Sequence, residues 1–319
     1  MYRLLISLLY VSLSLSAYAL DDPWLQIDKA SQAARKLNYK GIFLYQNYHD
    51  VRSIEITHFN NGSEEFARII TLDGPPREFL SRGNNVVQFN SNHENVLIQK
   101  RHGRNLFPAI LPMNIESVKL SYRLRFGDQD RIGGRGAQIV YLDPRDEYRY
   151  FYKLWLDKEF SLVLKMMIFD QNQKVIEQAS FNQVSLLNTQ DLNWFKPNVD
   201  THKKYIMDEE PNDKVSNEKY CTLTNLPSGY KEVSHVTRTI GNQPQLVHQW
   251  VFSDGLSFVS LFINPISKGQ KSKVGQTQVG SSNIYAKVLK GHQVMVVGEV
   301  PLVTIQKISN SIHDLKEHQ

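Results

Sequence analysis

Hydrophobic and polar residues alternate through much of the first half of the chain, with the period of two that is typical of β-strands. The alternation is clear in 53–59 and clearest in 148–157, where Tyr or Leu occupies every second position from 148 to 156. The positions between them hold charged residues and two aromatic residues. Residues 162–169 are apolar at both alternating sets of positions, and 181–187 closes the series. Because only short turn-like gaps separate the later segments, we expect an antiparallel, strongly curved sheet rather than alternating βαβ units.

Two other segments have the three-to-four-residue spacing of an amphipathic helix. In 22–38, Asp22 can cap the first turn, and Pro23 suits its backbone conformation. The apolar face of this segment is formed by Ile27, Ala30, Ala34 and Leu37. A last helix is expected after Pro301, with an apolar stripe at Leu302, Ile305, Ile308 and Ile312.

Strand-like segments return in the last third of the chain, and two glycine-containing pairs separate them. An Asp-Gly pair lies at 254–255 and a Lys-Gly pair at 290–291, each between two apolar segments. A two-residue hairpin turn requires positive φ angles, which glycine adopts without steric cost. We therefore expect two hairpins here, which with the last helix predict a second, smaller α+β domain.

Residues 189–219 separate the two sets of strands and differ from both. They are rich in Asn, Asp, Lys and Glu, contain two prolines and show no sustained periodicity. Such composition is typical of a connector between domains, although Trp194 and Phe195 indicate that part of it docks on a domain. The expected organisation is a first domain over 20–188, this connector, and a second domain over 220–319.

The first nineteen residues have the pattern of a secretory signal peptide. Arg3 precedes an apolar run over 4–15, and an Ala-Tyr-Ala site follows at 17–19. The run is too short to span a bilayer as a permanent helix. The cleavage point lacks the cysteine that would indicate a lipid anchor. We expect an exported chain whose mature form starts near Leu20; the alternative is an N-terminal buried helix.

Composition and charge narrow the partners. The chain has 319 residues, of which 41% are hydrophobic, so it can build substantial cores; 37 Lys and Arg stand against 32 Asp and Glu, a formal charge of +5. This mild excess of positive charge favours acidic partners or anionic lipid headgroups. The sequence lacks the dense basic tract that would predict nucleic-acid binding. Basic clusters at 100–104 and 123–125 could meet phosphates or be ordinary solvated surface. Because Cys221 is the single cysteine, an internal disulfide is excluded, and this residue is either a small core residue or a thiol that is reactive or forms an intermolecular bridge.

Signatures of catalysis are missing from the sequence. It contains no G-x-S-x-G elbow, no P-loop and no H-E-x-x-H motif, and the glycines of 133–136 lack the spacing of a dinucleotide site. The ten histidines are scattered, with no close ligand pair on a recognisable helix. Asp128 and Asp130 could mimic a paired-carboxylate site, but their charged, Gly-rich surroundings favour a solvated loop. We expect no enzyme activity, no metal and no cofactor.

A strand that is apolar on both faces must be covered on both, or must enclose something. A curved sheet wrapped over a helix could leave a lipid-sized cavity, and methionine adapts well to irregular acyl chains. An ordinary core is the alternative explanation, and a one-residue register error would exchange the two faces. The residues predicted to line the cavity are Tyr150, Tyr152, Leu154, Leu164 and Met166.

The hairpin predicted at 254–255 carries more aromatic residues than one small core can hold. Aromatic side chains that remain on a surface often anchor interfaces, although a core role is equally compatible with the pattern. The following loop, 266–278, adds lysines that can steer an acidic peptide. The residues predicted to contact a partner are Trp250, Phe252, Phe258, Lys268, Lys271 and Lys273, with Phe262 as a further aromatic of the same hairpin.

Several stretches resemble the MucB/RseB family, periplasmic regulators of the envelope-stress sigma factor. They occur in the expected order over nearly the whole mature chain, and together they are quite specific. One departure from the family pattern is the stretch 188–219. The stretches are YKGIFLY at 39–45, LDGPPREF at 72–79, YKLWLD at 152–157, FSDGLS at 252–257, GHQV at 291–294 and VGEVP at 297–301.

The resemblance implies a first domain similar to periplasmic lipoprotein carriers, a half-open antiparallel barrel with helices, and a smaller α+β domain. It implies a periplasmic protein that binds the periplasmic part of a membrane anti-sigma factor, largely through the second domain. The protein would shield that partner from proteolysis and be released by lipopolysaccharide or related envelope lipid. The alternative is a periplasmic lipid or lipoprotein carrier, but such carriers usually have one domain. Whether the chain forms a homo-oligomer is left open.

Overall fold

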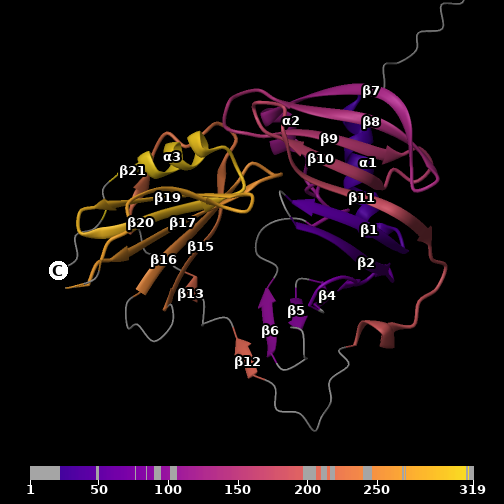
Figure 1. Cartoon of the computed structure of the whole chain (residues 1–319), viewed down its shortest axis with the longest axis horizontal. Helices are drawn as coiled ribbons and strands as arrows, with labels where there is room; N and C mark the ends of the chain where they lie inside the picture. Colours follow the sequence, from indigo (N-terminus) through magenta and orange to yellow (C-terminus); the bar gives the residue numbers. More distant parts are fainter. Residues whose placement is uncertain are drawn as a thin grey trace, which may run out of the picture.

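The chain folds into two β-sheet domains that lie next to each other (Figure 1). The computed structural model describes residues 22–47, 50–75, 77–83, 85–89, 95–100, 106–196, 206–209, 214–215, 220–239, 246–267, 269, 271–313 and 315. The expected signal peptide, 1–19, and the basic residues 101–104 lie outside these ranges. None of the helices in the described ranges is long and apolar enough to cross a membrane.

The N-terminal domain is built on a curved sheet with the strand order β12-β6-β5-β4-β3-β2-β1-β11-β10-β9-β8-β7. Neighbouring strands are antiparallel except for the parallel pair β12 and β6, which confirms the expected antiparallel architecture. The strands are β1 (Tyr39–Asn47), β2 (Asp50–Asn60), β3 (Glu65–Thr71), β4 (Glu78–Arg82), β5 (Asn85–Phe89), β6 (Asn95–Lys100), β7 (Tyr122–Ile132), β8 (Arg135–Pro144), β9 (Phe151–Asp157), β10 (Val163–Phe169), β11 (Val175–Leu186) and β12 (Ile206–Glu209).

Two helices, α1 (Trp24–Lys36) and α2 (Glu116–Ser121), pack on this sheet. The backbone N–H of Trp24 donates to Asp22 Oδ1 at 3.0 Å, so Asp22 caps the first turn as predicted. The predicted apolar face of α1 is buried in the same core as the inner face of the sheet: Ile27, Ala30 and Ala34 are at most 1% exposed. Burial of this face, rather than helix propensity alone, holds a helix of this length in place.

The strand predicted over 148–157 begins only at Phe151. The backbone N–H of Tyr148 donates to Asp146 Oδ1, which turns the chain before the strand starts. On the outer face of β9, Trp155 is only 3% exposed, because Lys153 and Lys165 lie over its ring at 4.7 and 4.6 Å. The sheet is thus apolar on both faces, as predicted, and lysine side chains cover part of the outer one.

The C-terminal domain is a sheet of order β13-β15-β16-β17-β20-β19-β18. One face is covered by α3 (Leu302–Asn310), whose Ile305 and Ile308 are fully buried as the predicted stripe requires. A separate short pair joins β14 (Thr222–Leu223) to β21 (Ile312–His313). The strands of the sheet are β13 (Lys214–Val215), β15 (Lys231–Thr239), β16 (Leu246–Ser253), β17 (Phe258–Pro265), β18 (Gly275–Val279), β19 (Ser282–Leu289) and β20 (His292–Gly298). The mainly β, α+β fold class is confirmed.

Both predicted hairpins form, with different turns. Lys290 and Gly291, at φ values of 46° and 74°, make the predicted two-residue turn between β19 and β20. The hairpin at 254–255 needs four residues, because the last paired residues are Ser253 and Phe258. Gly255 supplies a φ of 102° in this turn, which a residue with a side chain rarely adopts.

The predicted connector contributes to the N-terminal domain. Its short helix η1 (Leu192–Phe195) lies against β3, where Arg68 Nη1 donates to the carbonyl of Trp194 at 2.8 Å. The Arg68 guanidinium also lies 4.3 Å from the Trp194 ring, and the Phe195 ring packs on that of Phe66. The expectation that part of this segment docks on a domain is confirmed, while the domain limits themselves stay a prediction.

Candidate functional site

The two domains meet where the turn between β16 and β17 enters the N-terminal domain. Leu256, at the tip of this turn, is 7% exposed and belongs to the N-terminal core rather than to the core of its own domain. Gly255 packs directly on α2. A Cβ at this position would overlap the Ser117 hydroxyl and lie 3.3 Å from the Val118 side chain, so only glycine allows this approach. We call residues 254–257 the docking turn.

A buried ion pair fixes the docking turn. Arg149 Nε lies 2.9 Å from Asp254 Oδ2, and both side chains are fully buried. Arg149 also pairs with Asp146 and donates to the Ser228 carbonyl. Burial opposes the charge of Arg149, but the carboxylates of Asp254 and Asp146 outweigh this cost and raise its pKa. Removing Arg149 would leave the Asp254 carboxylate buried without a counter-charge, whereas removing Asp254 would leave the buried guanidinium of Arg149 with Asp146 as its remaining carboxylate partner.

The other carboxylate oxygen of Asp254 organises the turn itself. Asp254 Oδ1 accepts hydrogen bonds from the backbone N–H groups of Leu256 and Ser257 and from the Ser257 hydroxyl, at 2.8 to 3.0 Å. An Asx turn of this kind explains why aspartate suits the first position of the turn. One side chain therefore shapes the turn and attaches it to the other domain.

Further hydrogen bonds join the domains around this pair. The Tyr148 carbonyl accepts from the hydroxyls of Thr304 at 2.8 Å and Tyr230 at 3.3 Å. Burial raises the pKa of Tyr230 well above its usual value, so its hydroxyl stays protonated and can donate. On the other side of the contact, Asn47 Nδ2 donates to Ser281 Oγ at 2.9 Å. Contacts on several elements thus set the orientation of the domains.

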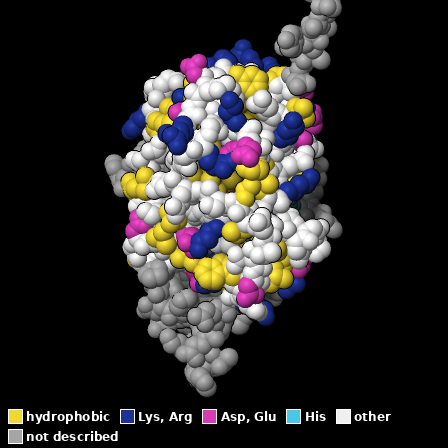
Figure 2. All heavy atoms as spheres, turned by 90° about the vertical axis from the view of Figure 1, so that its right-hand side faces the viewer, with side chains coloured by type: hydrophobic (Ala, Val, Ile, Leu, Met, Phe, Trp, Pro, Cys, Tyr) yellow, Lys and Arg dark blue, Asp and Glu magenta, His cyan; other side chains and the backbone are white. Residues whose placement is uncertain are grey.

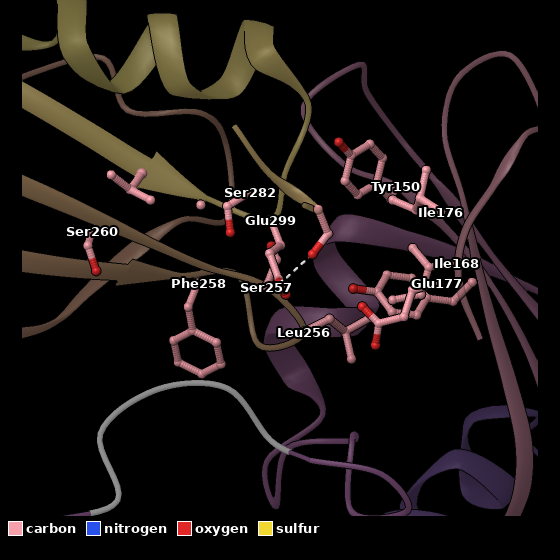
Figure 3. A pocket seen from close by; sticks show the side chains of 14 residues that line it. Tyr150, Ile168, Ile176, Glu177, Leu256, Ser257, Phe258, Ser260, Ser282 and Glu299 are labelled. Carbon is pink, nitrogen blue, oxygen red and sulfur yellow. Dashed lines mark hydrogen bonds between the residues drawn. The ribbon is translucent and has the colours of Figure 1, made fainter. Parts of the chain in front are cut away.

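A cavity of about 300 Å³ lies beside the docking turn, between the domains (Figure 3). Its N-terminal wall comes from the segment before β9 and from β9, β10 and β11, and its C-terminal wall from β17, β19, β20 and the segments that flank them. Clefts between domains are frequent ligand sites. The lining residues are Tyr150, Tyr152, Ile168, Ile176, Glu177, Leu256, Ser257, Phe258, Ser260, Ser281, Ser282, Val297, Gly298 and Glu299.

A second pocket, of about 260 Å³, lies on the inner side of the N-terminal sheet. Its walls are mainly apolar, and its polar residues include Arg52, which pairs with Asp50, and the exposed Arg77. Glu177, only 3% exposed, lines both this pocket and the cavity between the domains. The lining residues are Phe43, Tyr45, Asp50, Arg52, Ile54, Ile69, Thr71, Arg77, Phe79, Leu106, Phe107, Met166 and Glu177.

The structure divides the five residues predicted to line one apolar cavity. Tyr150 and Tyr152 line the cavity between the domains, and Met166 lines the N-terminal pocket. Leu154 and Leu164 are fully buried in the core and are part of neither lining. The period-two pattern placed Tyr152, Leu154, Leu164 and Met166 on the inner face, but it could not show where packing leaves space. A ligand for these residues stays a prediction.

The residues predicted to contact a partner are divided as well. Trp250 and Phe252 are 3% and 0% exposed in the core of the C-terminal domain. Phe258 and Phe262, by contrast, are half-buried, and Phe258 lines the cavity between the domains (Figure 3). Lys271 and Lys273 are exposed, whereas Lys268 lies outside the described residues. Partner binding by any of these residues stays a prediction.

Other candidate chemistry finds little support. In the described ranges no group of three or more His, Cys, Asp and Glu could hold a metal ion. Cys221 is half-buried, and burial, followed by the charge of Glu232, raises the pKa of its thiol to about 12, which disfavours the thiolate. Figure 2 shows the side that faces away from the C-terminal domain: basic side chains are dispersed there among hydrophobic and acidic ones. Arg125, for example, pairs with Asp143.

Family comparisons agree with the two-domain architecture. The MucB/RseB N-terminal domain matches residues 23–199, and the MucB/RseB C-terminal domain matches residues 215–313. The chain belongs to the MucB/RseB family. It is 26% identical over 295 residues to the sigma-E factor regulatory protein RseB of Escherichia coli K12, covering 90% of this chain and 89% of the relative. It is 27% identical to the sigma factor AlgU regulatory protein MucB of Pseudomonas aeruginosa, covering 97% and 95%.

Solved structures from the MucB/RseB family share the fold. A crystal structure of MucB in complex with MucA(peri) aligns with a TM-score of 0.74 at 22% identity, covering 93% of this chain and all of that one. The Pseudomonas aeruginosa MucA/MucB complex aligns with a TM-score of 0.73 at 22% identity, covering 92% and 98%. At this level of identity the likeness establishes the fold. The named relatives are regulatory proteins rather than enzymes.

Sequence reasoning missed the residues that join the domains. The sequence pattern gives no sign of the role of Arg149, and it identifies Asp254 only as a turn residue. The sole signal for the docking turn was the FSDGLS stretch, which resembles the MucB/RseB family but has no periodicity that distinguishes an interdomain contact from a hairpin. Arg52, beside the N-terminal pocket, is isolated in the sequence and carried no signal, and Arg77 belongs to the LDGPPREF stretch, which gives no sign of a pocket.

Proposed function

We propose that this chain is a regulatory binding protein that binds the periplasmic part of a membrane-bound anti-sigma factor. Its relatives are named as regulators of sigma factors, and their family members crystallised with MucA(peri) share its two-domain fold. The observation that carries most weight is that both family domains are present in order over 23–199 and 215–313. A simple carrier would not require the second domain or its buried attachment to the first.

The C-terminal domain supplies much of the grip in this proposal. Phe258 and Phe262 are half-buried residues of β17. Lys271 and Lys273 are exposed in the segment between β17 and β18. Aromatic side chains at a surface provide apolar contact, and lysines favour encounter with an acidic segment. By occupying the partner, the chain would shield it from proteolysis in the periplasm.

The N-terminal pocket is the proposed lipid site. Its apolar walls suit an acyl chain, Met166 can adapt to an irregular one, and the exposed Arg77 offers a charge for an anionic headgroup. Glu177 lines both this pocket and the cavity between the domains, so a lipid bound in the N-terminal pocket would lie next to the interdomain cavity. Envelope lipid such as lipopolysaccharide would bind here and release the anti-sigma factor.

Calorimetric titration of the mature chain with the periplasmic segment of its cognate anti-sigma factor tests the main proposal. We expect a complex that protects the segment from proteolysis and dissociates when lipopolysaccharide is added. A truncation that ends near Lys219 should bind and protect less well. Equal protection by the truncation would contradict the role of the C-terminal domain, and absence of binding by the full chain would overturn the proposal.

A matched pair of variants tests the lipid site. Ile69→Trp adds bulk to the N-terminal pocket, whereas Ile284→Trp adds the same group to the C-terminal sheet, away from that pocket. We expect only Ile69→Trp to weaken binding of a fluorescent acyl-chain probe in protein that retains its circular dichroism spectrum. Transfer of bound lipid to acceptor membranes, without any anti-sigma binding, would favour the alternative of a lipid or lipoprotein carrier.

A further inference from the structure

The two sheets differ in how their terminal strands are protected. The edge of a sheet presents unpaired backbone N–H and C=O groups, and proteins usually guard it with charges, proline or a bulge. The terminal strand β7 follows this rule: it carries five exposed charged residues and a bulge between Phe126 and Gln129. At one end of the C-terminal sheet, β13 is only two residues long. The other end, β18, has none of these features.

Strand β18 is an open edge. Its sequence is Gly-Gln-Thr-Gln-Val, without charge or proline, and all five residues are exposed. It pairs with β19 on one side in an unbroken register from Gly275 to Val279, and within the described part of the chain no strand lies on its other side. Val274 and Val279 at its two ends are 72% and 65% exposed. A regular, uncharged edge with apolar ends is suited to accept another strand.

The two faces of this edge would give an added strand a defined environment. Gln276 accepts a hydrogen bond from Gln306 of α3 at 3.2 Å, so its side chain lies on the helix side of the sheet. By alternation, Thr277 lies on the other side, opposite the half-buried Ile284. Apolar residues of an added strand would extend this second face at every second position.

Charge indicates which strand would bind. Lys271 and Lys273 are exposed immediately before β18, and neither forms an ion pair with any carboxylate of the described residues. The backbone N–H of Lys273 donates to Gln293 Oε1 at 2.7 Å, which holds this segment beside the sheet. An acidic residue flanking the incoming strand would therefore meet two lysines at a fixed position.

We propose that β18 binds an extended, acidic segment of the anti-sigma factor as an added strand of the C-terminal sheet. This inference rests on the proposed function and names the element through which the chain holds its partner. Main-chain hydrogen bonds supply the attachment, while the lysines and the alternating apolar positions select the segment.

Hydrogen exchange on the full chain tests the inference directly. Saturation with the periplasmic segment of the cognate anti-sigma factor should slow amide exchange at least tenfold at those β18 residues whose N–H groups face solvent. If the segment binds and exchange in β18 is unchanged, the inference is overturned while the proposed function stands. If the segment does not bind at all, the proposed function fails. Protection of β18 in the free chain that grows with protein concentration would identify a second copy as the occupant and would also overturn the inference.

Proline substitutions provide an independent test. Consecutive residues of an edge strand direct their N–H groups alternately to the neighbouring strand and to solvent. Of Thr277→Pro and Gln278→Pro, the variant that loses the solvent-facing N–H should keep the native melting temperature and bind at least tenfold more weakly. Asp128→Pro, in the bulge of the charged edge β7, is the matched control and should bind normally. Native affinity in a normally stable β18 variant would contradict the inference.

Discussion

The Arg149–Asp254 pair predicts a large effect of Asp254→Asn, a change of one atom. The amide keeps the size of the carboxylate and can still accept at Oδ1, so the turn can form. It removes the charge that lies 2.9 Å from Arg149 Nε, and the guanidinium remains fully buried. Breaking one side of a buried pair costs about 3–5 kcal/mol. Because Arg149 retains Asp146 and the Ser228 carbonyl, we expect a loss at the lower end, about 3 kcal/mol.

Calorimetry measures this loss as a lower melting temperature. At about 2–4 °C per kcal/mol for a large domain, the expected decrease is about 6–12 °C. The matched control is Asp143→Asn, which breaks the pair of Asp143 with Arg125, where the side chains are 30% and 57% exposed. Exposed pairs contribute about 0–1 kcal/mol, so this variant should melt close to the native chain.

A double variant separates loss of charge balance from loss of shape. In Arg149→Met combined with Asp254→Asn, no uncompensated charge remains buried, so part of the stability lost in Asp254→Asn should return. Urea denaturation of Arg149→Met, Asp254→Asn and the double variant gives the three free energies of unfolding that are compared. If the loss in the double variant equals the sum of the two single losses, the residues act independently. A melting temperature of Asp254→Asn within 2 °C of the native one would refute the argument.

Three further predictions concern single residues. Gly255→Ala should destabilise the chain by about 2 kcal/mol or more and increase protease cleavage between the domains, because its φ is 102° and a Cβ would overlap Ser117; unchanged cleavage would contradict the close approach. Burial lowers the pKa of His235, so below about pH 6.5 the unfolded state binds more protons and stability should fall between pH 7 and 5; urea midpoints should show this fall, and it should shrink in His235→Gln. At pH 7.5 a maleimide should modify Cys221 slowly in the native chain and quickly in urea, since its pKa is about 12; equal rates would show that the thiol is accessible and reactive.

Local patterns in the sequence determined the elements and their faces. The spacing of Ile27, Ala30 and Ala34 fixed the buried face of α1, and alternation grouped Leu154 with Tyr152 on one face of its strand, because side-chain direction follows from backbone geometry within a few residues. The turn at Lys290 and Gly291 was equally determined, since it depends on local φ angles.

Tertiary structure alone decided which surfaces meet and where space remains. Leu256 leaves its own domain for the core of the other, and Arg149 and Asp254 pair across that contact. Trp155 is buried on the outer face because Lys153 of its own strand and Lys165 of the neighbouring strand β10 cover it. Periodicity states that a face is apolar, but a cavity such as the one lined by Met166 is the volume left after distant segments pack, and an open edge such as β18 depends on which strand has no neighbour. These properties arise from contacts between residues far apart in the chain, and a local sequence pattern contains no information about such contacts.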